Sequence, residues 1–555
     1  MSWYNKVVSL RDELQSFFKG DLDDSPKTLE MYSHDASIFS VRPALVVYPK
    51  GVDDIKKLAL FVNEAKQKGR NISLTARSGG TDMTGGPLSE SIIIDMTRSF
   101  NQIKEVGADF AVVQPGVYYR DFEKETLKHN LILPSYPASR EICTVGGMVA
   151  NNSGGEKTLQ YGKTERYVRE LKMILRDGNE YTFKKITKEE LESKINAGGV
   201  EGEIYKNLSA LIKQNQDILT KAKPDVTKNS SGYFLWNVYD PADGTFDITK
   251  VITGSQGTFG IITEITFALV KPKPFSRMLV IFLKDIKRLS ELTEAILVHK
   301  PESFESYDDN TFRLAIKFFP EMIHRIKGGM LRIMLSFIPE LWMIMTSGIP
   351  KLVLLIEFTS DTVEEATRKA EAAHKALHTK FTYKMHVTKS DTETQEFWVV
   401  RRESFNLLRK HVKGLRTAPF IDDFAVNHKY LPEFLPKLYT ILARYSLIYT
   451  VAGHVGDGNF HIIPLMKLAD PKSKDIIIKL SREVYDLVLS YKGAITAEHN
   501  DGLIRTPFLK QAYGEEVYTL FEKTKEIFDP NTIFNPGKKV GADTRYVLAH
   551  LDTRV

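Results

Sequence analysis

Residues 145–155 read Val-Gly-Gly-Met-Val-Ala-Asn-Asn-Ser-Gly-Gly, and the run Pro-Ala-Ser-Arg precedes them at 137–140. Two other stretches are also rich in glycine. Residues 77–82 read Arg-Ser-Gly-Gly-Thr-Asp, and residues 253–261 read Thr-Gly-Ser-Gln-Gly-Thr-Phe-Gly-Ile. Backbone N–H groups in such turns can converge on a phosphate because no Cβ blocks the approach. The three stretches therefore predict the walls of a site for a diphosphate-bearing cofactor.

The sequence around these glycines favours an α/β unit that is neither a nicotinamide-binding nor a P-loop fold. We expect a strand at 44–48, then an amphipathic helix that starts at Val52, then a second strand at 72–76 that leads into the first glycine loop. A third strand is expected after this loop, at 91–95. The glycines do not follow the Gly-x-Gly-x-x-Gly pattern that opens a Rossmann helix, and no Gly-Lys-Ser/Thr run occurs at P-loop spacing. From about residue 278, strand-like runs alternate with long helical stretches, which predicts an antiparallel sheet with helices on one face.

Length and composition limit the class of protein. The chain has 555 residues, 42% of them hydrophobic, and a net charge of +6, so we expect two or three globular domains. No Lys/Arg tract is interleaved with aromatic residues, which argues against nucleic-acid binding. The single cysteine, Cys143, excludes an intramolecular disulfide and a cysteine-ligated iron–sulfur cluster and fits a reducing, cytoplasmic compartment. We interpret it as a small buried side chain rather than a redox group.

A fourth stretch carries histidines rather than a long glycine loop. Residues 454–461 read His-Val-Gly-Asp-Gly-Asn-Phe-His, and Ala-Glu-His follows at 497–499. The pair Asp-Gly predicts a two-residue hairpin turn. In that register His454 lies directly opposite His461, with the Cβ atoms about 4.5–5.5 Å apart. Two imidazoles at this spacing, with Glu498 as a third ligand, predict a divalent metal site, whereas the alternative is an exposed histidine pair.

In chain order these motifs resemble the flavin-dependent oxidoreductases of the vanillyl-alcohol-oxidase/PCMH type, in the D-lactate and D-2-hydroxyglutarate dehydrogenase branch. The resemblance runs from about residue 32 to 538 and includes Gln-Pro-Gly at 114–116 and Asn-Pro-Gly-Lys at 535–538. It implies an α+β fold and FAD, bound non-covalently because the first glycine loop has no His or Cys. The implied cofactor-binding residues are Arg77, Ser78, Gly79, Gly80, Thr81, Asp82, Pro137, Ser139, Gly146, Gly147, Val149, Asn152, Ser153, Gly154, Gly254, Gly257, Gly260, Ile261 and Asn535. It also implies that a strand around 254–261 lies along the cofactor.

The resemblance implies four parts of the chain. We expect an N-terminal helical segment (1–32), a PCMH-type FAD-binding domain of two subdomains (33–275), an antiparallel-sheet-and-helix substrate or cap domain (276–510) and a C-terminal segment that returns to the FAD domain (511–555). We expect residues 318–349 to form an apolar helical insertion within the cap. We favour packing on its own domain; the alternative is a surface helix pair that lies on the inner face of a membrane or docks a partner.

The same resemblance implies the oxidation of a D-2-hydroxy acid such as D-lactate, D-2-hydroxyglutarate or glycolate. In such enzymes the glutamate of Glu498-His499 binds a metal, here zinc or manganese, together with His454 and His461, and the histidine acts as the base. A metal on the substrate oxygens lowers the pKa of the hydroxyl group, and a neutral imidazole takes its proton. A planar guanidinium suits the carboxylate, and the run Trp-Val-Val-Arg at 398–401 nominates Arg401, with a surface helix charge as the alternative.

The chain departs from the family pattern at several positions. Gln256 stands where glutamate is common, and Asn500 stands where glycine follows Glu-His, although asparagine tolerates positive φ. Residues 419–426 lack the lysine that binds substrate in some relatives, which disfavours a dicarboxylate or moves its second clamp to Lys410, Lys413 or Arg416.

The electron acceptor is a separate expectation. The iron–sulfur half of longer relatives is missing, so we expect reduced flavin to discharge to a quinone, an iron–sulfur protein, a cytochrome or oxygen. Two other classes stay open at this point. One is a flavoprotein subunit of an electron-transfer complex with a separate iron–sulfur partner. The other is an oxidase of the same fold that acts on another alcohol.

Overall fold

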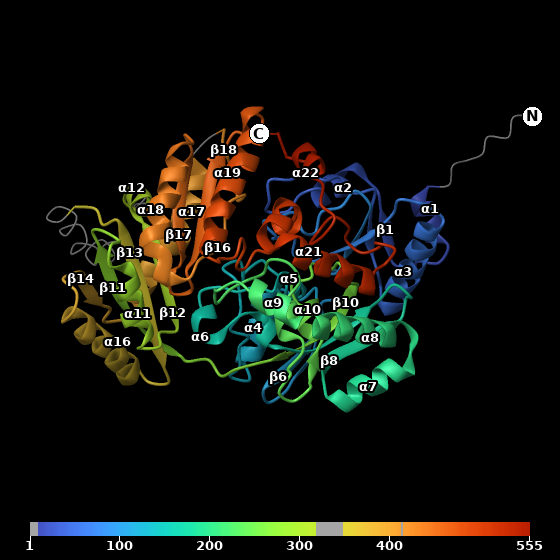
Figure 1. Ribbon diagram of the computed structural model, residues 1–555, viewed down its shortest axis with the longest axis horizontal. Coiled ribbons are helices and arrows are strands. Elements are labelled where there is room, and N and C mark those ends of the chain that lie inside the picture. Colours follow the sequence, from blue (N-terminus) through green and yellow to red (C-terminus); the bar gives the residue numbers. More distant parts are fainter. Residues whose placement is uncertain (1–8, 318–347, 412–413, 555) are drawn as a thin grey trace, which may run out of the picture.

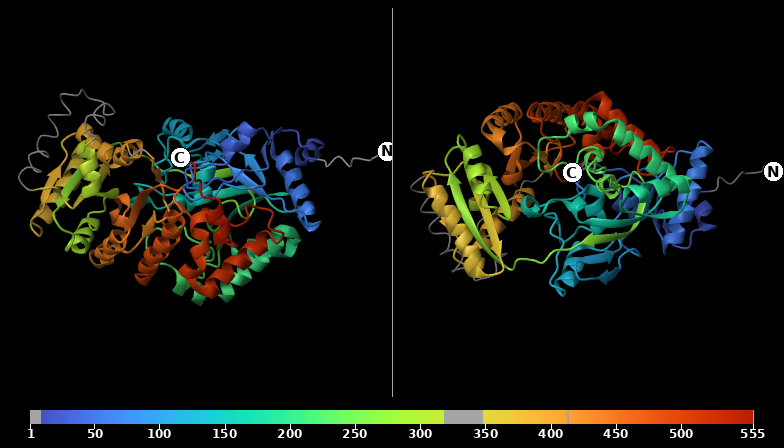
Figure 2. Two further views of the ribbon diagram at one scale, coloured as in Figure 1. Left: turned by 90° about the horizontal axis from the view of Figure 1, so that it is seen from above. Right: turned by 60° about the horizontal axis from the view of Figure 1, so that its bottom comes forward.

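The computed structural model describes residues 9–317, 348–411 and 414–554, which form three β-sheets with their covering helices (Figure 1). The first two sheets and the third lie at opposite ends of the molecule, and further views keep this arrangement (Figure 2). Most of the segment predicted as an apolar insertion, residues 318–347, lies outside the described residues, so that prediction stays open. No helix in the described part of the chain is both long enough and apolar enough to span a membrane.

The first sheet contains the strand–helix–strand unit predicted from the sequence. Its order is β1-β2-β4-β3, with β2, β4 and β3 parallel, and the strands are β1 (Asp21–Asp23), β2 (Leu45–Tyr48), β3 (Leu74–Arg77) and β4 (Ile92–Asp95). Helix α3 (Val52–Gln67) covers it with the apolar face expected from its sequence, including Ile55, Leu58 and Val62. Since β3 ends at Arg77, the first glycine loop leaves the sheet at a strand end.

The second sheet is antiparallel and has the order β5-β6-β10-β7-β8-β9. Its strands are β5 (Ile103–Val106), β6 (Phe110–Val113), β7 (Val168–Ile174), β8 (Glu180–Ile186), β9 (Phe246–Asp247) and β10 (Ile261–Ala268). The strand expected around 254–261 begins only at Ile261. The residues before it form a turn instead, since Gly254, Gln256 and Gly257 have φ of +89°, +53° and +69°, values incompatible with a strand.

Helices surround these two sheets and carry the second glycine loop. They are α1 (Leu10–Gln15), α2 (Pro26–Tyr32), α4 (Tyr119–Leu127), α5 (Val145–Asn151), α6 (Thr158–Tyr161), α7 (Lys188–Ala197), α8 (Gly199–Gln214), α9 (Gln216–Ala222) and α10 (Thr249–Ile252). From the other end of the chain, α21 (Leu509–Phe528) contributes Val517, Leu520 and Phe521 to the core of the second sheet. The end of the chain therefore packs against elements near its beginning.

The third sheet is the antiparallel cap that the sequence predicts. Its path is β14-β11-β13-β12-β17-β18-β15, and β16 pairs with β18. The strands are β11 (Phe275–Leu283), β12 (Ser303–Asp308), β13 (Leu352–Ser360), β14 (Lys384–Val387), β15 (Arg416–Thr417), β16 (Phe424–Ala425), β17 (Ile448–His454) and β18 (Asn459–Met466). The helices around it are α11 (Leu289–Leu297), α12 (Asp309–Lys317), α16 (Val363–His378), α17 (Asp391–His411), α18 (Leu431–Ala443) and α19 (Lys472–Ser490). The short α20 (Gly502–Arg505) and α22 (Thr544–Ala549) follow in the C-terminal part.

Helices cover both faces of this sheet, so the expectation of helices on one face was wrong. Leu279 and Ile281 of β11 pack in the core that includes α16, α18 and α19. The alternate residues Met278 and Val280 pack with Trp398 of α17 on the other face. The central strands are apolar on both sides, and all nine residues of β13 are buried. A strand that is apolar at successive positions needs cover on both faces.

Candidate active site

A cavity of about 680 Å³ unites the glycine-rich stretches with the third sheet. Most of the predicted cofactor residues line it: Arg77, Ser78, Gly79, Gly80, Thr81, Asp82, Pro137, Ser139, Gly146, Gly147, Ser153, Gly154, Gly257 and Gly260. The five predicted metal and catalytic residues line the same cavity: Arg401, His454, His461, Glu498 and His499. Its volume falls in the usual range for ligand and cofactor sites. The glycine loops and the predicted metal and catalytic residues therefore line the same cavity.

The other five predicted cofactor residues do not line the cavity: Val149, Asn152, Gly254, Ile261 and Asn535. They lie behind its walls. The Asn535 amide donates to the carbonyls of Gly86 and Gln256, at 3.0 and 2.6 Å, and its oxygen accepts from Thr75. The backbone N–H of Gly254 donates to the carbonyl of Val149. These contacts hold the glycine loops together.

The glycine loops pack closely on each other, which explains several of their residue types. Ser78 and Thr144 share a hydroxyl–hydroxyl hydrogen bond of 2.5 Å between the first and second loops. A Cβ on Gly79 would lie 2.9 Å from the carbonyl oxygen of Ile142, closer than carbon atoms tolerate. Arg77 donates to two backbone carbonyls of the 32–34 segment, so its guanidinium holds the start of the loop. The backbone wall that results suits a diphosphate, and these residues fit FAD.

Gln256 and Cys143 also border the cavity. The Gln256 side chain accepts from the backbone N–H of Gly502 at 2.8 Å and donates to Asn151 at 3.2 Å, so glutamine joins two loops at this position. Burial raises the pKa of the Cys143 thiol to about 12. A thiol in that state is a poor nucleophile, in line with its interpretation as a small buried side chain.

The histidine hairpin differs in register from the prediction. Residues 455–457 form a 3₁₀ turn, and Gly458 follows in the left-handed region with φ of +65°. His454 therefore pairs with Asn459, and His461 pairs with Ala452, so the two histidines are diagonal rather than direct neighbours. The connection is longer than a two-residue Asp-Gly turn, which shifts the register. Both side chains still face the same side of the sheet, and their ring centroids are 5.3 Å apart.

The turn that carries Glu498 and His499 is fixed by one buried carboxylate. Asp423 Oδ2 accepts from the backbone N–H groups of residues 497, 498 and 499 at 3.0, 2.8 and 2.7 Å, and from the hydroxyl of Thr496. Asn500 follows with φ of +69°, so the expectation that asparagine tolerates this conformation is confirmed. The short Glu-His turn is thereby held at the cavity wall.

The predicted metal ligands come together. Single donor atoms of His454, His461 and Glu498 all lie within 4.8 Å of one another. Two overlapping groups that include Asp422 or Asp423 meet the same criterion. These two carboxylates are committed elsewhere, because Asp423 accepts four donors and Asp422 contacts two imidazoles. Two nitrogens and one carboxylate oxygen remain, a ligand set that suits Zn²⁺ with an open position.

A lysine that was not identified from the sequence lies next to the predicted metal ligands. Lys228 is fully buried, and its ammonium lies 2.6 Å from Glu498 Oε1 and 3.2 Å from Asp457 Oδ2. Burial lowers the pKa of Lys228, but the carboxylates of Asp457 and Glu498 outweigh it and raise the pKa above its ordinary value. The same contact helps to hold the pKa of Glu498 well below its ordinary value despite burial. Glu498 is therefore ionised and able to bind a cation.

Arg401 belongs to the cavity rather than to an exposed helix surface. Its side chain is 17% exposed, and Nη2 lies 3.2 Å from Glu305 Oε2. Its Nε is buried without a partner among the described residues, so a donor is free for a bound anion. Of the suggested alternatives, Arg416 pairs with Asp552 and does not line the cavity. The side chains of Lys410 and Lys413 lie outside the described residues.

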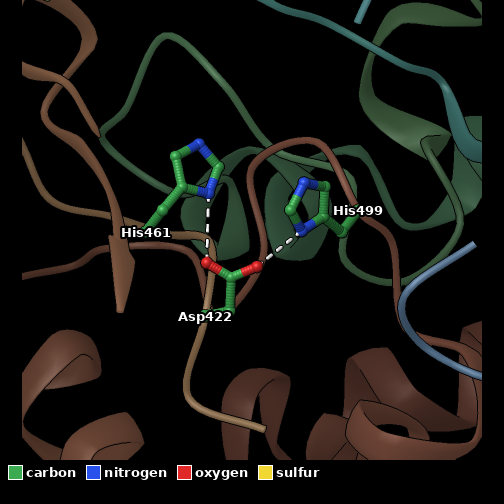
Figure 3. Close-up of side chains that lie close together, drawn as sticks. All are labelled: Asp422, His461 and His499. Carbon is green, nitrogen blue, oxygen red and sulfur yellow. Dashed lines mark hydrogen bonds and ion pairs between the residues drawn. The ribbon is translucent and has the colours of Figure 1, made fainter. Parts of the chain in front are cut away.

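The predicted base has a carboxylate partner. His499 Nδ1 lies 2.8 Å from Asp422 Oδ2, and His461 Nδ1 lies 3.1 Å from the other oxygen of the same carboxylate (Figure 3). Burial lowers the pKa of His499, but Asp423 and Asp422 raise it to about 9. In the same way, burial lowers the pKa of His454, whereas Glu305 raises it to about 9. The site is therefore rich in negative charge and favours added cations.

Four charged residues of this site had not been identified from sequence: Glu305, Lys228, Asp422 and Asp423. Glu305 lies within the buried strand β12, whose six residues are all inaccessible. Its sequence, Ser-Phe-Glu-Ser-Tyr-Asp, mixes polar with aromatic residues, so no local pattern marked Glu305 as buried. Asp422 and Asp423 lie in the stretch 419–426, which the sequence analysis considered only because it contains no lysine.

Comparison with known proteins agrees with this architecture. Residues 43–184 match the FAD binding domain model, and residues 273–539 match the FAD linked oxidases, C-terminal domain. The chain is 16% identical to 4-ethylphenol oxidase from Gulosibacter chungangensis, with a TM-score of 0.64 over 93% of this chain and 94% of that one. The fold is that of the vanillyl-alcohol-oxidase/PCMH type.

The chain thus carries the FAD binding domain followed by the FAD linked oxidases, C-terminal domain. It is 26% identical over 537 residues to D-2-hydroxyglutarate dehydrogenase from Pseudomonas putida, covering 94% of this chain and 51% of that protein. It is also 26% identical to glycolate oxidase subunit GlcD from Bacillus subtilis, over 95% of both chains. The chain thus spans about half the length of the first relative and nearly all of the second.

Proposed function

We propose that this protein is an FAD-dependent dehydrogenase that oxidises a D-2-hydroxy acid, of the D-lactate, D-2-hydroxyglutarate or glycolate class, to the 2-oxo acid. One observation carries the proposal. The cavity bordered by the glycine loops also contains Arg401, the three candidate metal ligands and His499. The relatives named as dehydrogenases or an oxidase of hydroxy acids support the substrate class.

Each group has a role that follows from its contacts. FAD, when bound non-covalently against the glycine loops, would accept the hydride of the substrate Cα. A divalent ion, zinc or manganese, supplies a Lewis acid for the substrate oxygens. Nδ1 of His454 and Nδ1 of His461 are engaged by carboxylates, which leaves each Nε2 to bind the ion with Glu498. Arg401 binds the substrate carboxylate, and His499 takes the hydroxyl proton at Nε2.

The choice among hydroxy acids depends on whether a second carboxylate is bound. Besides Arg401, the described cavity residues include the guanidinium groups of Arg140 and Arg402. Arg402 Nη2 lies 2.6 and 2.7 Å from the two oxygens of Glu156, so much of its charge is already compensated. Arg140 has looser contacts, at 3.7 Å to Glu123 and to Glu141, so it is the candidate for a second carboxylate, and the response to 2-hydroxyglutarate tests it.

The experiment is an anaerobic panel of D-lactate, D-2-hydroxyglutarate and glycolate against the FAD-loaded protein. We expect loss of the oxidised flavin absorbance with at least one of them and no such loss with the L enantiomer of a chiral substrate. A chelator should slow the reduction, and added Zn²⁺ or Mn²⁺ should restore it. Flavin that stays oxidised with every acid would contradict the proposal.

A second candidate function rests on the Bacillus subtilis relative, which is named as a subunit of glycolate oxidase and matches over 95% of its length. On this reading the chain is a flavoprotein subunit that passes electrons to a separate iron–sulfur protein, cytochrome or quinone. Reoxidation of the reduced flavin separates the possibilities. Fast reaction with an artificial dye and slow reaction with oxygen favour a dehydrogenase or subunit, whereas fast reaction with oxygen favours an oxidase of this fold.

A further inference from the structure

Two buried carboxylates occupy equivalent places beside the two histidines of the candidate metal site. Glu305 Oε1 contacts His454 Nδ1, and Glu305 Oε2 lies 3.2 Å from Arg401 Nη2. Asp422 Oδ1 lies 3.1 Å from His461 Nδ1, and Asp422 Oδ2 lies 2.8 Å from His499 Nδ1. Each carboxylate therefore uses one oxygen on a metal-binding imidazole and the other on a group that handles substrate.

We propose that Glu305 and Asp422 are positioning residues that couple metal binding to substrate handling, Glu305 through Arg401 and Asp422 through His499. The proposal rests on the function proposed above for the same site. It adds a division of labour. Glu305 links the ion to the binding of the substrate carboxylate, and Asp422 links the ion to removal of the hydroxyl proton.

Burial makes these links strong. The Glu305 and Asp422 side chains are 1% and 0% exposed. Charge-assisted contacts in such surroundings are stronger than those in water, because solvent does not screen them. Each carboxylate also fixes the tautomer of its imidazole, since an acceptor at Nδ1 keeps the proton there and leaves the Nε2 lone pair available.

An amide at position 422 would change the tautomer of His499. In Asp422→Asn one oxygen can still accept from His461, but an NH₂ group replaces the oxygen that faces His499. That group would face His499 Nδ1 in place of an oxygen 2.8 Å away, which disfavours a proton on Nδ1. The ring proton would then move to Nε2, and the lone pair that accepts the substrate proton would be lost. The geometry of the site would be retained while the base is blocked, an effect of about 10²–10⁴-fold on the rate.

At position 305 the amide acts on a different step. In Glu305→Gln the oxygen can still accept from His454, and the NH₂ group faces the guanidinium of Arg401. Two donors then oppose each other, and Arg401 loses its anchor. We expect the dissociation constant for substrate to rise by roughly tenfold or more with a much smaller change in the limiting rate.

The experiment measures metal affinity and single-turnover kinetics on the FAD-loaded full chain. Zinc content after equilibrium dialysis against buffered Zn²⁺ gives the affinity without reference to activity, and anaerobic flavin reduction at saturating Zn²⁺ gives the limiting rate and the substrate dissociation constant. Both amide variants should bind Zn²⁺ about 10–100-fold more weakly. Asp422→Asn should then lower mainly the limiting rate, and Glu305→Gln should raise mainly the dissociation constant.

A matched control is Glu357→Gln, a buried carboxylate of the adjacent strand β13 that does not line the cavity. It should leave zinc affinity and both kinetic constants within about twofold of wild type. The carboxylate-retaining variants Glu305→Asp and Asp422→Glu keep a charged acceptor and should recover most of the lost zinc affinity. If an amide variant fails to bind FAD, Glu305→Asp and Asp422→Glu provide the test in its place. Zinc affinity near that of wild type is expected for these two variants, and weak zinc binding by both would contradict the coupling.

The outcomes separate this proposal from the proposed function. Suppose that wild type binds Zn²⁺ and a hydroxy acid reduces its flavin, but both amide variants have unchanged zinc affinity. This outcome overturns the coupling and leaves the proposed function standing. If the two amide variants change the same constant, either the limiting rate or the substrate dissociation constant, the division of labour is overturned. Wild type that neither takes up Zn²⁺ nor is reduced by any acid overturns the function itself.

Discussion

Lys228 is a fully buried cation next to Glu498, and its removal should weaken the folded protein most when no metal is bound. Its ammonium lies 2.6 Å from Glu498 and 3.2 Å from Asp457, with no exposed surface. At an effective dielectric constant near 20, each contact corresponds to about 5–6 kcal/mol of Coulomb attraction. Desolvation offsets much of this, and removal of one partner from a buried pair costs about 3–5 kcal/mol. Lys228→Met keeps the length of the side chain but removes the ammonium that Glu498 and Asp457 share, and Glu498 then keeps the His454 imidazole, 3.5 Å away, as its neighbour.

The assay compares urea midpoints by circular dichroism at neutral pH in excess chelator. We expect a clearly lower midpoint for Lys228→Met and a partial return in the double variant Lys228→Met/Glu498→Gln, because one uncompensated charge is then gone. Zn²⁺ should raise the midpoint of Lys228→Met by more than that of wild type, since the ion replaces the missing charge. Lys429→Met is the control, because Lys429 forms an ion pair of 2.9 Å with Asp225 on the exposed surface.

Two results would refute this reasoning. One is a midpoint for Lys228→Met equal to that of the Lys429→Met control in chelator. The other is a double variant that is less stable than Lys228→Met. Either would mean that the Lys228–Glu498 contact contributes little, and that the negative charge of the site is tolerated without it.

Three further outcomes are expected. Glu498→Gln should retain FAD absorbance but lose zinc binding, and its anaerobic flavin reduction should fall at least about 100-fold; unchanged reduction would remove the ion from the reaction. Arg401→Met should raise the substrate dissociation constant about 10–100-fold in the same assay, and an equal value would exclude it as the carboxylate clamp. Burial and the nearby charge of Glu302 raise the pKa of Glu357 to about 7. The stability that goes with the neutral carboxyl group is fully present below pH 4.5, the ordinary pKa, and is lost as the pH rises through 7. Between pH 4.5 and 8 the free energy of unfolding of wild type should therefore fall by on the order of 3 kcal/mol relative to that of Glu357→Gln. Urea midpoints at several pH values check this, and parallel curves would count against it.

Much of the fold follows from local pattern. The first parallel strands, the helix at 52–67 and the strand beginning at 352 could be predicted because hydrophobic periodicity reports which side of an element is buried. The two-sided cover of the third sheet could have been inferred from β13, whose residues 352–356 are apolar without alternation. Its partner helix α17 carries many charges, which concealed the apolar face that includes Trp398.

Residues of the candidate site could be predicted from the sequence only where they belong to short motifs. His454, His461 and the Glu498-His499 pair share recognisable spacing, and the cavity contains all four. The register of their hairpin was wrong because Gly458 closes a longer turn than Asp-Gly alone suggests. Glu305 lies 149 residues from His454, and Asp422 lies 39 residues from His461. Such pairings depend on which strands become neighbours, and no local pattern encodes that.

The proposed base and the proposed metal ligands form one electrostatic unit rather than two adjacent sites. The backbone N–H groups of Glu498 and His499 share the same Asp423 oxygen, so neither residue moves alone. The carboxylates near His499 raise its pKa to about 9, which leaves it largely protonated at neutral pH. A protonated imidazole cannot accept the hydroxyl proton, so His499 needs a compensating positive charge nearby to act as a base. The ligand set of His454, His461 and Glu498 is the place where such a charge would be held. The acidity of the surroundings, which would hinder an isolated base, thus favours binding of a cation that would both polarise the substrate and lower the pKa of His499.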